Sequence, residues 1–174
     1  MKKYLLLLVA IFGMSLCASA QKTEIQVGYG GYTQMDACDC HDGWNNVNTA
    51  WGALTAGVNF NVAPKIWIGP SYTFSSTKTD GGKNASKIAY HAILFNGRYE
   101  YYRTSKVKVY AHVGLGAVIS HMQPKFDDSY NCTYFAYQIT PVGAQIGISR
   151  SASLFGELGF GAQGLIQVGF RFGI

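Results

Sequence analysis

Large apolar residues alternate with small or polar residues along several stretches of the chain, most regularly in residues 164–174. One face of this stretch carries Ile166, Val168, Phe170, Phe172 and Ile174, and the other carries Gln167, Gly169 and Arg171. Strict alternation over about ten residues indicates a β-strand with two unlike environments. A strand of a transmembrane barrel has such a pattern, with its apolar face in lipid and its polar face in the lumen. We expect this stretch to be the closing strand of a barrel.

The same alternation predicts eight strands over the whole chain. Their expected bounds are 23–33, 50–62, 66–75, 88–101, 107–119, 134–149, 153–161 and 164–174. Long polar connections follow the first, third and fifth strands, and the third of these spans residues 121–133. Short turns follow the second, fourth and sixth strands. A membrane barrel has this asymmetry, with short turns on the periplasmic side and longer loops outside.

Two prolines interrupt the predicted alternation. In the sixth strand the apolar positions change phase near Thr140–Pro141, which predicts a β-bulge there. Pro70 lies on the apolar face of the third strand. Because proline has no N–H to donate to the ladder, Pro70 requires either a bulge or a locally unpaired position.

The first 20 residues have the features of a cleaved secretory signal peptide. A positively charged start precedes an apolar run, and residues 18–20 read Ala-Ser-Ala, a small-residue cleavage site. The apolar run is too short for an ordinary spanning helix. Cys17 raises the alternative of a lipoprotein, although the residue before it is larger than that processing prefers. We predict a signal peptide over residues 1–20 and one barrel domain over residues 21–174.

Composition agrees with a membrane barrel. The chain has 12 Tyr, 10 Phe and 21 Gly, and its charged fraction is only 13%, compared with about 25% in an ordinary soluble domain. No stretch after the signal approaches the ~20 apolar residues of a transmembrane helix. The net charge of +5 includes two lysines of the signal. The remaining charge is too small to indicate nucleic-acid binding, and we expect no nucleic-acid partner.

These features together resemble the small outer-membrane β-barrels of the OmpA/OmpX type, also called porin-family or outer membrane protein β-barrel domain proteins. The resemblance rests on the signal, the eight alternating strands, the long and short connections and the terminal Gly-Phe-Arg-Phe-Gly-Ile, and it covers the whole mature chain. It implies an all-β, eight-stranded antiparallel transmembrane β-barrel, an up-and-down meander, in the outer membrane of a Gram-negative cell. Ile174 stands where such chains usually end on an aromatic residue.

The resemblance also implies partners. They are the lipid bilayer with its outer-membrane lipids, and the barrel-assembly machinery during insertion. We expect a monomer without a cofactor or a metal, and the sequence leaves any surface partner open.

Six charged residues fall on the predicted inward face, all toward the periplasmic end. They are Glu24, Arg98, Glu100, Lys108, Glu157 and Arg171. Three acids and three bases in a narrow lumen are expected to pair, because an isolated buried charge is costly. We interpret this lumen charge cluster as an electrostatic plug. The alternatives are a gate whose pairs exchange to open a small conduit, and a catalytic carboxylate pair.

Three cysteines of the mature chain, Cys38, Cys40 and Cys132, lie in predicted outer loops. Because an exported chain is oxidised, we expect a loop disulfide from Cys38 or Cys40 to Cys132, which leaves one cysteine over. The alternative is a metal site made of the three thiolates and His41. Cys38, Cys40 and His41 lie very close together in sequence, whereas Cys132 is remote. This spacing favours the disulfide over the metal site.

The predicted function is that of a non-enzymatic integral outer-membrane barrel with a structural or surface-interaction role. The alternative is a narrow porin-like channel for small solutes or ions. A loop-based enzyme is a third hypothesis, because His121, Asp127 and Asp128 share one loop, but no nucleophile motif accompanies them and we expect no catalytic residue. A soluble lipocalin-like barrel would instead place its apolar residues inside.

Overall fold

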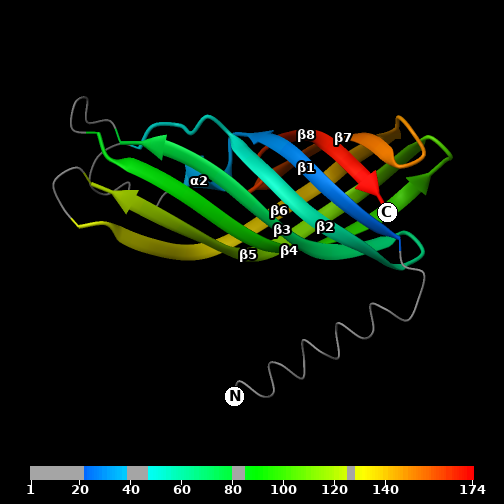
Figure 1. Cartoon of the computed structure of the whole chain (residues 1–174), viewed down its shortest axis with the longest axis horizontal. Helices are drawn as coiled ribbons and strands as arrows, with labels where there is room; N and C mark the ends of the chain where they lie inside the picture. The colour runs from blue at the N-terminus through cyan, green and yellow to red at the C-terminus, as the bar shows by residue number, and fades with distance from the viewer. Residues whose placement is uncertain (1–21, 39–46, 80–84, 125–127) are drawn as a thin grey trace, which may run out of the picture.

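The computed structural model describes residues 22–38, 47–79, 85–124 and 128–174. Eight antiparallel strands form one closed barrel in which each strand pairs with its neighbours in sequence and β8 closes on β1, so the predicted meander is confirmed (Figure 1). The strands are β1 (Thr23–Gly31), β2 (Ala53–Ala63), β3 (Ile66–Lys78), β4 (Lys87–Arg103), β5 (Val107–Gln123), β6 (Tyr130–Gly147), β7 (Ala152–Gly161) and β8 (Ile166–Gly173). A short helix, α2 (Gln34–Ala37), follows β1. The expected signal peptide lies outside the described residues.

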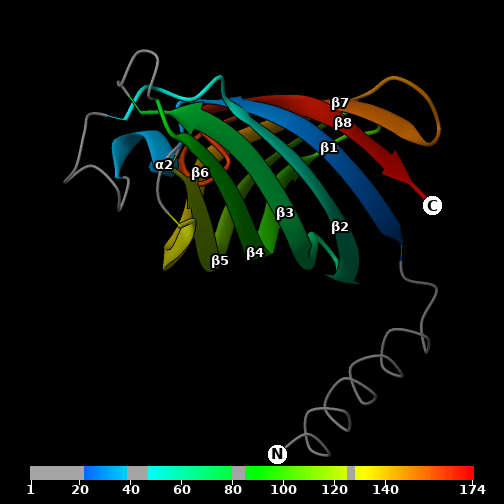
Figure 2. The same cartoon turned by 60° about the vertical axis from the view of Figure 1, so that its left-hand side comes forward.

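The two ends of the barrel differ. We call the end with the β2–β3, β4–β5 and β6–β7 turns the turn end. The N-terminus of β1 and the C-terminus of β8 also lie at this end (Figures 1 and 2). The opposite loop end has the other four connections and α2. Within the described ranges, no helix is long and apolar enough to cross a membrane.

The central strands are longer than the alternation predicts. β4, β5 and β6 have 17, 17 and 18 residues, and the predicted loop over residues 121–133 is wrong at both of its ends. His121 pairs with Asn131 across the β5–β6 ladder, so both strands continue into that region. The apolar alternation stops there because both faces of these strand ends are polar or mixed, while the backbone ladder needs no particular side chain.

Both prolines have the expected effect. The register shifts between Ile139 and Val142 on the β7 side of β6, so the bulge beside Pro141 is confirmed. Pro70 pairs with Phe95 of β4, whereas the β2 ladder has no pair at that position and keeps the same register on both sides. Pro70 therefore takes the second of the two expected solutions, a locally unpaired position without a bulge.

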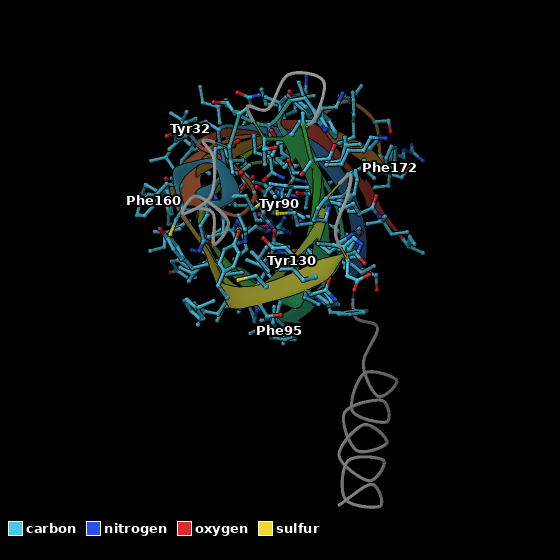
Figure 3. All side chains as sticks on the ribbon, turned by 90° about the vertical axis from the view of Figure 1, so that its left-hand side faces the viewer. Tyr32, Tyr90, Phe95, Tyr130, Phe160 and Phe172 are labelled. Carbon is cyan, nitrogen blue, oxygen red and sulfur yellow. The ribbon has the colours of Figure 1, made fainter. Side chains whose placement is uncertain are left out.

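The outer surface of the barrel is apolar, and the lumen is filled. Large apolar side chains such as Phe95, Leu115 and Phe135 are more than half exposed on the outside. Figure 3, a view along the barrel, shows Phe95, Phe160 and Phe172 pointing outward and Tyr90 inside the ring of strands. This arrangement is the opposite of that in a soluble barrel.

The loop-end half of the lumen departs from the small and polar inward face that the sequence predicts. Its buried cluster is apolar and comprises Met35, Ile88, Tyr90, Ala92, Leu94, Val118, Met122, Ala136 and Ala162. Met35 belongs to α2, whose residues thus close the lumen from the loop end. The inward face was misjudged here because these strands are apolar on both faces, which removes the alternation signal.

Candidate functional site: the charged lumen

Four of the six predicted lumen charges form one network near the turn end. The guanidinium of Arg98 on β4 donates to Glu24 of β1 at 2.5 Å and lies 3.4 Å from Glu100. The Lys108 ammonium on β5 lies 3.4 Å from Glu24 and 3.6 Å from Glu100. Arg98 and both carboxylates are buried, so each charge is compensated by an opposite charge inside the barrel.

The other two predicted charges form a second network further inside. Arg171 of β8 donates from Nη2 to Glu157 of β7 at 2.8 Å. The Tyr110 hydroxyl also donates to Glu157 at 2.8 Å, and the His112 ring nitrogen Nδ1 lies 3.2 Å from the other carboxylate oxygen. Glu157 therefore has three partners, which come from two strands besides its own, β5 and β8.

Glutamine side chains link the two networks. Gln145 of β6 accepts a hydrogen bond from Arg171 at 3.0 Å, and its amide nitrogen lies 3.5 Å from Glu24. Gln26 accepts from Arg171 at 3.3 Å. The structure thus brings all six predicted residues into one hydrogen-bonded layer that extends across the lumen.

Aromatic rings fill the space between the guanidinium groups. Arg171 lies over the rings of Phe155 and Tyr110, at 4.2 and 4.7 Å from their centroids. Arg98 lies over the Trp67 ring at 4.7 Å and over the Tyr110 ring at 5.3 Å. A cation over an aromatic face is attracted by the ring quadrupole, and the attraction increases on desolvation. These rings stabilise the cations and also exclude water from the layer.

A layer of uncharged polar side chains separates the charges from the apolar half. Thr55 bonds to Thr73 at 2.9 Å, and Asn96 donates to Ser71 at 2.8 Å. The central cavity bounded by Arg98, His112 and Arg171 has a volume of only about 10 Å³. That space accommodates about one water molecule and no larger solute.

Sequence reasoning missed three members of the charged layer. Tyr110 and His112 share the inward face of β5 with Lys108, so the alternation that identified Lys108 also marks them. Arg103 lies 3.4 Å from Glu100, but a register shift between Glu100 and Tyr102 separates it from the inward face of β4. No local signal identifies a residue that lies beyond such a shift.

The structure describes only some of the residues that the predicted loop disulfide, the metal site and the loop-based enzyme would use. Cys38 is a free, exposed thiol and Cys132 is disulfide-bonded, while Cys40 and His41 lie outside the described residues. The bridge from Cys38 to Cys132 and the site of three thiolates are therefore both excluded. His121 contacts Asn131 at 2.5 Å, Asp128 is exposed, and Asp127 lies outside the described residues.

The closed barrel, its apolar exterior and its filled, charged lumen define a transmembrane β-barrel of the outer-membrane class. The family model described as outer membrane protein beta-barrel domain matches residues 4–162, and the chain belongs to this family. Membership implies an outer-membrane location, with the turn end toward the periplasm.

Solved structures of similar shape have very different sequences. The N-terminal β-barrel domain of Pseudomonas aeruginosa OprF is 9% identical, with a TM-score of 0.56, and the match covers 88% of this chain and 97% of that one. Ail, the attachment invasion locus protein of Yersinia pestis, is 12% identical, with a TM-score of 0.49 and coverage of 88% and 94%. The similarity to OprF concerns the fold. Comparison with curated proteins gives no match.

Proposed function

We propose that the protein is a non-enzymatic, non-conducting barrel whose role is structural or lies at the cell surface. The closed lumen supports this proposal most directly. Along the barrel axis the described side chains form a paired charged layer, a hydrogen-bonded polar layer and an apolar layer beneath Met35. A conduit through all three layers would require many buried side chains to move together.

The energetics of the charged layer favour a permanent plug. Opening it would separate Glu157 from Arg171, and both side chains are 2% exposed. Breaking a buried ion pair so that one charge remains uncompensated costs on the order of 3–5 kcal/mol. The aromatic contacts of Arg171 would be lost in the same movement.

The loop end supports a surface role. The apolar band of an outer-membrane barrel is about 25 Å tall, and about 9–11 tilted residues cross the membrane. With 17 or 18 residues each, β4, β5 and β6 extend well beyond that band. Their loop-end segments therefore stand outside the membrane as a wall of paired strands, visible as the long strands of Figure 1.

Planar-bilayer recording of the refolded mature protein tests the proposal. We expect no discrete conductance steps from protein whose insertion has been verified by protease protection. The Arg171→Ala variant, which removes a side chain from the plug, is the matched comparison. Reproducible steps from the unaltered protein that change in this variant would overturn the proposal and favour a narrow channel.

A further inference from the structure

The turn end carries an excess of positive charge. Each of its three turns contains one basic residue and no acidic residue: Lys65, Lys106 and Arg150. Lys22 and Arg103 add two more cations at this end. By contrast, all acidic residues except Glu24, Glu100 and Glu157 fall in sequence between β1 and β2, between β3 and β4, or between β5 and β6.

The excess is not neutralised by the lumen acids. Glu24 and Glu100 are already paired with Arg98 and Lys108 in the buried network. Within the part of the chain that the structure describes, no salt bridge involves Lys22, Lys106 or Arg150. These three side chains are exposed.

The unpaired cations surround a hollow in the barrel mouth. Two adjoining open cavities, of about 470 and 160 Å³, share Glu24, Lys108 and Arg150 in their walls. Lys22 lines the larger cavity and Lys106 the smaller one. Hydroxyl-bearing residues complete the walls: Thr104, Ser105, Ser149, Ser151 and Ser153. We call this hollow the basic cup.

One wall of the basic cup is aromatic. Trp67 lines the larger cavity, is 2% exposed, and its indole N–H has no hydrogen-bond partner in the described structure. Lys108 lies over the same ring at 5.5 Å from its centroid, which holds one cation of the wall in place.

We propose that the basic cup binds a soluble, phosphate-bearing solute from the periplasmic side. Lysine, arginine and hydroxyl side chains are the usual partners of phosphate oxygens, and a cleft with an excess of one sign of charge concentrates ions of the opposite sign. The larger cavity is in the size range of small-molecule sites. Its walls include the inward-facing residues Glu24 and Lys108, so the cup opens along the barrel axis and not toward the surrounding lipid.

Isothermal titration with inorganic pyrophosphate tests this inference on the full mature barrel in zwitterionic detergent. We expect saturable binding that weakens about tenfold in Lys106→Gln and in Arg150→Gln, because each variant removes one charge-assisted contact. Lys65→Gln is the matched control, since Lys65 is a turn-end cation outside both cavities. Its affinity should equal that of the unaltered protein. Heat-dependent gel mobility verifies that every variant is folded.

Three results would overturn the inference. They are the absence of saturable binding, an equal loss of affinity in Lys65→Gln, and binding only to vesicles that contain an anionic phospholipid. The last result would assign the charges to lipid headgroups and not to a soluble solute. The basic cup borders the plug at Glu24 and Lys108, but the cations that the titration tests, Lys106 and Arg150, lie in the turns outside it. A conductance measurement that contradicts the proposed function would therefore leave this inference standing.

Discussion

At the scale of the residue, the Glu157 carboxylate contacts side chains from more strands than a single ion pair would. Its carboxylate accepts hydrogen bonds from Arg171 and Tyr110 and contacts His112. The strands that supply these partners are β8 and β5, while Glu157 itself lies on β7. One carboxylate thus ties together strands that are not all neighbours in the sheet.

Glu157→Gln should destabilise the barrel by about 3–5 kcal/mol. The substitution keeps the shape of the side chain but leaves the buried guanidinium of Arg171 without its anion. Urea unfolding of the protein in lipid vesicles, followed by tryptophan fluorescence, measures the change in the free energy of unfolding.

A double variant separates the loss of the pair from the loss of one partner. In Glu157→Met with Arg171→Met, no uncompensated charge remains, and apolar replacements of similar volume are often neutral or stabilising. We expect this double variant to be more stable than Glu157→Gln. A double variant that is less stable would show that the charges themselves, and not their mutual compensation, hold the lumen together.

At the scale of the element, α2 closes the loop end of the lumen, and hydrogen bonds of its own side chains hold it in place. Thr33 and Asp36 form a capping box at the start of the helix. The Gln34 side chain donates to the carbonyl of Phe135 and accepts from the N–H of Tyr137, both on β6. The Gln34 amide therefore satisfies two backbone groups of β6 that lie beyond the last residue pair between β6 and β7. This attachment positions Met35 over the apolar half of the lumen.

Met35→Ala should cost about 2 kcal/mol or more, because truncating a buried methionine removes apolar contacts and leaves a cavity. Cys38→Ser is the matched control, as Cys38 is an exposed free thiol in the same segment. Its free energy of unfolding should change little. Equal stability of the two variants would mean that α2 does not seal the lumen.

At the scale of the whole molecule, the exposed apolar surface occupies a defined part of the barrel along its axis. Leu115 is the central residue of β5 and is 55% exposed, and it pairs with Phe95 on one side and Tyr137 on the other. Ile148 is also exposed but follows β6 in a turn at the turn end. A membrane that spans the barrel should therefore surround Leu115 and leave Ile148 near its boundary.

Arginine substitutions test this placement. Leu115→Arg should cost about 2–4 kcal/mol, whereas Ile148→Arg should cost about 1 kcal/mol or less, because the penalty for a charge on the lipid face falls toward the interface. Reversible unfolding in guanidinium with phosphatidylcholine vesicles gives both values. Similar costs at the two positions would contradict the assigned membrane position.

The sequence alone determined the number, order and direction of the strands and the inward position of the six charges. These properties follow from period-two alternation, which is a local consequence of strand geometry. The phase change at Pro141 was readable for the same reason, since a bulge moves every later side chain to the other face.

Only the tertiary structure decided which inward residues meet. Arg98 reaches Glu24 across 74 positions of sequence, and Arg171 reaches Gln26 across 145. Such pairings depend on strand tilt and stagger in the closed barrel, which no single strand encodes. The apolar filling beneath α2 was likewise hidden, because Leu94 inside and Ile93 and Phe95 outside form one continuous apolar run in the sequence.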